Sequence, residues 1–160
     1  MKETKVIHPF PPIFDQNSKI LILGSMPSQK SREIGMYYAH PKNRFWKILS
    51  IVLNDDFPLS NEDKKAFLLK HNIAVWDVLK SCEIAGASDY SIRNPKVNNF
   101  NLIFNNCKIS AVFTLGKTAT KIYRSMTGNA STYLPSTSPA NCAIKDEELI
   151  KNFEIILKYL

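Results

Sequence analysis

Residues 20–46 read ILILGSMPSQKSREIGMYYAHPKNRFW. The apolar run at 20–23 has the length and composition of a buried strand. The segment GSMPS at 24–28 ends that run, because glycine permits unusual backbone angles and proline fixes φ and lacks an amide donor. Polar and aromatic side chains are then concentrated at 37–46. Open α/β sheets bind ligands where a strand ends in such a turn. The pattern therefore predicts a ligand site just beyond residue 24.

Strand-like and helix-like patterns alternate along the rest of the chain. This alternation predicts an α/β fold with a parallel sheet and right-handed crossovers. Further strands are expected at 73–78, 109–115 and 132–134, and helices at 43–53, 60–71, 99–106, 117–126 and 147–160. Residues 29–36 are interpreted as a polar connector, residues 80–99 as a long irregular loop, and residues 1–19 as an extended segment.

The overall composition limits the classes of partner and compartment. A chain of 160 residues favours one compact domain spanning 1–160. Its formal net charge of +7 is compatible with a polyanionic partner such as DNA. No apolar run approaches the ~18 residues of a membrane span, and the first residues lack the apolar core of a signal peptide. We expect a cytoplasmic monomer.

The cysteines give no sign of a metal centre. Cys82, Cys107 and Cys142 are widely separated, and no Cys-x-x-Cys or Cys–His ligand pair occurs. We expect three reduced thiols, no metal and no cofactor.

Three stretches together resemble the uracil-DNA glycosylase superfamily. They are GSMPS followed by YYAHPKNRFW at 24–46, AVWDVL at 74–79 and LPSTSPAN at 134–141. The AHPKNRFW run is similar to the mismatch-specific uracil/thymine-DNA glycosylases, and the GSMPS form looks most like the hypoxanthine-DNA (deoxyinosine) glycosylase branch. The resemblance implies a three-layer α/β/α sandwich around a four-stranded parallel sheet. Three cysteines argue against the branches that carry an iron–sulfur cluster.

The resemblance also implies an activity. The expected reaction hydrolyses the N-glycosidic bond of a deaminated base flipped out of double-stranded DNA. Hypoxanthine is the first candidate base, followed by uracil and xanthine. Two alternatives stay open: a uracil- or mismatch-specific glycosylase, and a non-catalytic module that binds damaged DNA. The absence of an obvious pocket lysine for a Schiff base favours a monofunctional enzyme.

The residue expected to orient the attacking water is Asn43. The superfamily usually places Asp or Asn at the position of Met26, and a methionine offers no strong acceptor to water. In the hypoxanthine branch the essential asparagine resembles the one in HPKN, which is Asn43. An amide is not a strong base, so a dissociative mechanism is expected, with backbone N–H groups of residues 24–28 facing the leaving base. The alternative role for Asn43 is a helix cap.

The expected base pocket combines the turn, one tyrosine and one carboxylate. The resemblance places Tyr38 against the flipped base, while the residues alone leave open whether Tyr37 or Tyr38 faces the pocket. Asp77, at the end of its strand, is expected to bind the base edge, to act as the base if Asn43 does not, or to be a simple turn residue. The turn residues assigned to the pocket are Gly24, Ser25, Met26 and Pro27.

The loop 135–141 is expected to hold DNA. Ser136, Thr137 and Ser138 offer hydroxyls and N–H groups to phosphate, and Pro139, Ala140 and Asn141 form a wedge or contact the partner strand. The alternative is an ordinary proline loop. His8 is interpreted as structural or solvated, and His40 as a packed, hydrogen-bonded residue rather than an acid. Further candidate phosphate contacts, each with a generic surface charge as the alternative, are Lys42, Arg44, Arg93, Lys96 and Lys117.

Overall fold

The centre of the structure is a parallel four-stranded sheet. The computed structural model describes residues 4–84 and 92–160. In this sheet the strand order is β3 (Ile73–Asp77), β2 (Ile20–Gly24), β6 (Ala111–Leu115), β7 (Thr132–Leu134). All three neighbouring pairs run parallel. The predicted parallel sheet is confirmed, and its four strands begin and end within two residues of their expected limits.

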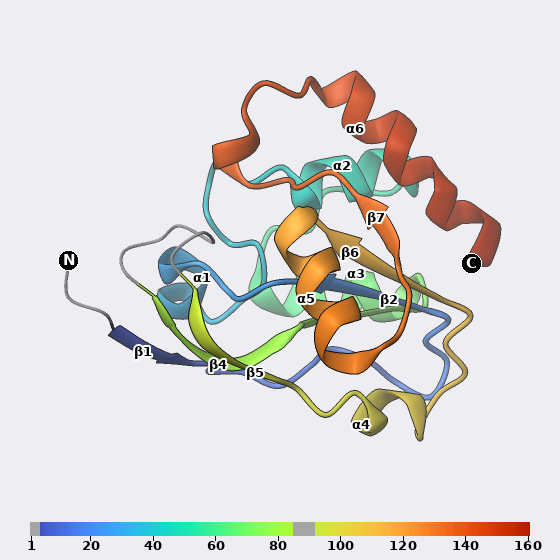
Figure 1. Ribbon diagram of the computed structural model, residues 1–160. Coiled ribbons are helices and arrows are strands. Elements are labelled where there is room, and N and C mark those ends of the chain that lie inside the picture. Colours follow the sequence, from blue (N-terminus) through green and yellow to red (C-terminus); the bar gives the residue numbers. More distant parts are fainter. Residues whose placement is uncertain (1–3, 85–91) are drawn as a thin grey trace.

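Both faces of the sheet are covered by helices (Figure 1). Every residue of β2 and β3 is buried, and since successive side chains of a strand point to opposite faces, neither face meets solvent there. Helices α2 (Phe45–Val52) and α3 (Asn61–Lys70) lie on one side, and α5 (Lys117–Thr127) lies on the other. Helix α6 (Asp146–Phe153), which continues as the 3-10 helix η3 (Glu154–Tyr159), runs beside α2. The short helix α4 (Asn101–Phe104) precedes β6. The three-layer α/β/α architecture is therefore present.

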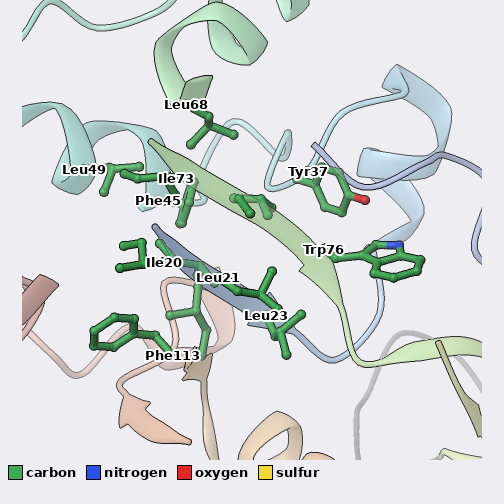
Figure 2. Close-up of a cluster of buried hydrophobic side chains, with 14 of the residues drawn as sticks. Ile20, Leu21, Leu23, Tyr37, Phe45, Leu49, Leu68, Ile73, Trp76 and Phe113 are labelled. Atoms are coloured by element: carbon green, nitrogen blue, oxygen red, sulfur yellow. The ribbon is translucent and has the colours of Figure 1, made fainter. Parts of the chain in front are cut away.

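The core forms where these layers meet the middle of the sheet. Figure 2 shows Leu49 of α2 and Leu68 of α3 packed against the central strands, with Phe113 of β6 close to Ile20 and Leu21. These five side chains are fully buried. Burying a side chain of this size stabilises the fold by about 1.5–3 kcal/mol. The core therefore stabilises the sheet that carries the predicted site.

A second, three-stranded antiparallel sheet was not predicted. It has the order β1 (Thr4–Ile7), β4 (Leu79–Ile84), β5 (Arg93–Val97). The expectation of an irregular loop over 80–99 was wrong for β4 and β5, and 1–19 holds a strand within its extended segment. Their sequences are polar, and their strand structure comes from pairing between distant segments rather than from propensity. The residues expected to form turns in 85–91, including Gly86, Ser88, Asp89 and Ser91, lie outside the described residues.

A second difference is a helix inside the expected connector 29–36. Helix α1 (Gln29–Ile34) begins after Ser28, whose hydroxyl accepts a hydrogen bond from the Ser31 N–H. It ends at Gly35, which has a φ of 81°, the left-handed conformation that glycine adopts easily. Both are ordinary helix signals, but the six-residue helix is too short for a clear apolar period.

Helix α3 begins at a reciprocal cap formed by Ser60 and Asp63. The Ser60 hydroxyl accepts a hydrogen bond from the Asp63 N–H at 3.0 Å, and the Asp63 carboxylate accepts one from the Ser60 N–H at 3.5 Å. This reciprocal pair satisfies two amides that the helix itself leaves free.

We expect Ser60→Ala to lower the free energy of unfolding by about 1 kcal/mol, because the Asp63 amide loses its acceptor. Urea denaturation followed by circular dichroism measures the change. Ser60→Asp, which keeps a capping acceptor, serves as the control and should remain close to the parent protein. Equal loss in both variants would show that the cap does not stabilise α3.

Candidate active site

Three parts of the predicted site follow the carboxyl ends of β2, β3 and β7. Gly24 is the last residue of β2 and Asp77 the last residue of β3, and the two are partners in the ladder. The loop 135–141 follows the end of β7 at Leu134. The sheet thus brings segments far apart in the sequence to one edge, which is where open α/β sheets bind ligands.

Asn43 and the loop 135–141 meet directly, although 94 positions separate Asn43 from Thr137. The Thr137 hydroxyl donates to Asn43 Oδ1 at 2.8 Å, and the Phe45 amide donates to the same oxygen at 2.9 Å. The second bond is of the kind that the capping alternative predicted, although Arg44 is the residue that immediately precedes α2. Both acceptor positions of the Asn43 oxygen are filled in this structure.

Arg44 fastens the same loop from beside Asn43. Its guanidinium donates to the carbonyl oxygens of Ile144 at 2.7 Å and Asn141 at 3.0 Å, and it pairs with Asp146 at 3.1 Å. Its backbone amide donates to the Thr137 carbonyl at 3.1 Å. Arg44 was predicted as a phosphate contact; in this structure its guanidinium makes three hydrogen bonds inside the protein. Hydrogen bonds from Lys47 and Arg44 lower the pKa of Asp146, which keeps this carboxylate charged.

The loop also binds itself. The Ser138 amide donates to the Ser136 hydroxyl, the Ala140 amide to the Ser138 hydroxyl, and the Asn141 side chain to the Ser136 carbonyl. Pro139–Asn141 form the 3-10 helix η2. Ser136 and Ser138 act as acceptors in these bonds, so each hydroxyl proton remains available to donate. The Thr137 proton is used by Asn43.

Gly24 lies beneath a carboxylate and a phenol. A Cβ atom at this position would come within 2.6 Å of Asp77 Oδ1 and 3.0 Å of the Tyr38 hydroxyl, so only glycine fits without displacing them. The Tyr38 ring stacks on the Phe45 ring, with centroids 4.1 Å apart. Tyr38 has a φ of 54°, an uncommon conformation for a residue other than glycine. Gly24, Tyr38 and Asp77 are therefore close neighbours.

The two candidate tyrosines have different surroundings. Tyr37 is 2% exposed, and its hydroxyl donates to the Pro11 carbonyl at 2.9 Å, so it belongs to the core. Tyr38 is partly exposed, and its hydroxyl lies beside Gly24. Burial, together with the nearby Asp77, raises the pKa of both phenols far above the ordinary value, so each keeps its proton.

His8 is a residue of this site that the sequence did not reveal. Its Nε2 lies 2.8 Å from Asp77 Oδ2, and both side chains are 3% exposed. β1 places it there by pairing with β4, and the His8 amide donates to the Lys80 carbonyl. Among described residues, His8 Nδ1 and the Tyr38 hydroxyl are the buried side-chain polar atoms without a hydrogen-bond partner. No local motif around His8 indicates this position.

No group of three or more potential metal-binding side chains is found within 4–84 and 92–160. No helix in the same ranges is long and apolar enough to span a membrane. An open groove does occur at the opposite edge of the sheet, lined in part by Lys19, Asn72 and Cys107. It contains none of the predicted site residues.

The chain is similar to known DNA glycosylases in sequence. The family model described as "Uracil DNA glycosylase superfamily" matches residues 11–160. A protein from Methanosarcina barkeri named hypoxanthine DNA glycosylase is 38% identical over 95 residues, which are 59% of this chain and 60% of that protein. One of the same name from Methanosarcina acetivorans is 38% identical over 92 residues, 57% of this chain and 58% of that protein. The match thus spans about three fifths of these relatives.

A solved structure resembles the whole fold. It is the solution NMR structure of a protein from Methanosarcina acetivorans that is provisionally named a uracil DNA glycosylase. The TM-score is 0.78 and the identity 28%, over 95% of this chain and 99% of that one.

Arg44→Met should loosen the loop 135–141. The variant leaves the Asn141 and Ile144 carbonyls without their charged donor, while Asp146 keeps Lys47, so we expect the free energy of unfolding to fall by about 2–3 kcal/mol. Amide hydrogen exchange should increase across the loop more than in β2. Lys30→Met, on the exposed surface of α1, is the control. Unchanged exchange in the loop would show that Arg44 does not hold it.

Proposed function

Because the chain belongs to the uracil DNA glycosylase superfamily, we propose that it hydrolyses the N-glycosidic bond of a deaminated base in double-stranded DNA, with hypoxanthine as the preferred base. Uracil and xanthine are the further substrates proposed. The names of two relatives support hypoxanthine over their aligned regions. A base inside the duplex is inaccessible, so it must first be flipped into a pocket, and a deaminated base in a weakened pair costs less to extrude.

The observation that carries the proposal is the pairing of an acceptor and a donor above Gly24. Asp77 Oδ1 can accept a hydrogen bond, and the Tyr38 phenol, which keeps its proton and has no partner among the described residues, can donate one. Deaminated bases present the complementary edge: an N–H group next to a carbonyl. Adenine and cytosine present an unprotonated ring nitrogen next to an amino group. The lone pair of that nitrogen would face the Asp77 carboxylate, which is also an acceptor. The subsite therefore suits hypoxanthine, uracil or xanthine.

The proposed water-holding group is Asn43 acting together with Thr137. The Thr137 hydroxyl gives its proton to Asn43 Oδ1, so its own lone pairs are free to accept a hydrogen bond from water. Neither group is a strong base, and Met26 offers no acceptor. We therefore propose a dissociative reaction, in which the sugar gains oxocarbenium character before water adds. Backbone N–H groups of residues 24–28 would stabilise the departing base. With no lysine among the residues assigned to the base pocket, the enzyme would be monofunctional.

The proposed DNA contact is the loop 135–141. The free hydroxyl protons of Ser136 and Ser138 are suited to phosphate oxygens, and the overall charge of +7 favours binding to DNA. The segment Pro139–Asn141, with Ala140 exposed, is the proposed wedge that fills the gap left by the flipped base.

One alternative has an observation in its favour. Met26 replaces the water-activating residue that the superfamily usually carries, which favours a module that binds damaged DNA without releasing the base. A uracil- or mismatch-specific glycosylase is the second alternative, and Met26 weighs against it.

The proposal is tested with duplexes that each carry one deoxyinosine, deoxyuridine or deoxyxanthosine. Incubation followed by alkaline strand cleavage reports the release of the base. We expect release from the deoxyinosine duplex to be fastest. Faster release from deoxyuridine would favour the uracil-specific alternative. Tight binding of the deoxyinosine duplex with no release from any duplex would favour the binding module.

Asn43→Ala should lower the single-turnover rate on deoxyinosine by at least about tenfold, because the Thr137 hydroxyl loses the acceptor that orients it. Thr137→Val removes only the hydroxyl and should lower the rate by at least about tenfold. Thr137→Ser keeps the hydroxyl and serves as the control. If Thr137→Val reacts as fast as Thr137→Ser, the water is not held through Thr137.

A further inference from the structure

We propose that His8 is a positioning residue, which fixes the Asp77 carboxylate so that its Oδ1 meets the N–H group of a deaminated base. This inference rests on the proposed function. His8 directly follows strand β1 (Thr4–Ile7). Residues 4–8 precede the region 11–160 that the family model matches. The pair therefore joins a terminal segment to the predicted pocket.

The geometry assigns one oxygen of Asp77 to each task. A carboxylate only accepts hydrogen bonds, so His8 Nε2 carries the proton of the 2.8 Å bond to Oδ2. The other oxygen, Oδ1, lies beside Gly24 and the Tyr38 hydroxyl. The terminal torsion of an aspartate is broad, and without His8 the two oxygens would be free to rotate. A charge-assisted bond of this kind holds one orientation.

The surroundings of His8 argue against a merely structural role. Its ring lies against Phe10 and Tyr37, with centroids 5.0 and 5.7 Å away, and its Nδ1 has no partner. Burying a polar nitrogen without a hydrogen bond costs free energy, and an apolar side chain would suit this aromatic surrounding better. The contact that histidine adds here is the one with Asp77.

Few other polar groups reach the pair. Tyr37 and Tyr38 are the titratable neighbours whose pKa the Asp77 charge raises, and both keep their protons. Asn98 donates to the backbone carbonyls of Asp77 and Leu79 and not to the carboxylate. Among the described residues, His8 is the one cation-forming side chain that contacts Asp77.

The test is a double-mutant cycle read as kcat/KM for release of hypoxanthine from a deoxyinosine duplex. His8→Leu should lower kcat/KM by about 10- to 100-fold, since a hydrogen bond to a charged group is lost. His8→Gln keeps an N–H donor and should recover most of the activity. In the Asp77→Asn background, His8→Leu should have no further effect, because the residue it positions is already changed.

Two controls separate positioning from stability. His71→Leu removes a similar pair, His71 Nε2 with Asp55 at 2.7 Å, away from the site and should leave kcat/KM unchanged. Thermal melting of each variant shows whether it is folded. His8→Leu leaves a buried carboxylate without a partner and can itself lower the stability of the fold. Asp77→Asn removes that charge and His8→Gln keeps a donor for it, so these variants do not leave an unpaired carboxylate.

The outcomes are distinct. Rescue by His8→Gln together with a non-additive cycle supports the inference. Multiplicative effects of His8→Leu and Asp77→Asn, or full activity of folded His8→Leu beside impaired Asp77→Asn, overturn it while the proposed function stands. No base release by the wild-type protein overturns the proposed function, and the inference with it.

Discussion

The close approach of Gly24 to Asp77 is the constraint on which the candidate site depends. These two residues are partners at the ends of β2 and β3. A Cβ atom on residue 24 would lie 2.6 Å from Asp77 Oδ1 and 3.0 Å from the Tyr38 hydroxyl, so a side chain at this position would displace both groups. Both strands are fully buried, so the ladder that sets this distance is held by the core. The relative position of Gly24 and Asp77 is therefore set by the sheet rather than by a loop.

The other part of the site is held by polar contacts rather than by burial. Thr137 bonds to Asn43, and Arg44 bonds to three groups between residues 141 and 146. Phe45 links the two parts, because its ring stacks on Tyr38 while its amide donates to Asn43. A structural change in the loop 135–141 can therefore alter the position of Tyr38 through the segment 43–45.

The sequence predicts the features that are encoded locally. Apolar runs such as 20–23 and the Ser60 cap specify the parallel sheet and α3, and the motif around Asn43 identifies the segment that meets Thr137. The second sheet escapes prediction because β4 and β5 are polar and become strands only by pairing with each other and with β1. His8 escapes for the same reason, since its place beside Asp77, 69 positions further along the chain, exists only after β1 has paired with β4.

The central claim is that an extruded base lies over Gly24 with its N–H group facing Asp77. A structure of the complex with a duplex carrying 2′-fluoro-arabino-deoxyinosine tests it most directly, because the fluorine disfavours the oxocarbenium character that cleavage requires. The account predicts the hypoxanthine ring beside Tyr38, its N1–H directed at Asp77 Oδ1, and the loop 135–141 inserted in the duplex. A base still stacked in the helix, or bound in the groove lined by Lys19, Asn72 and Cys107, would contradict it.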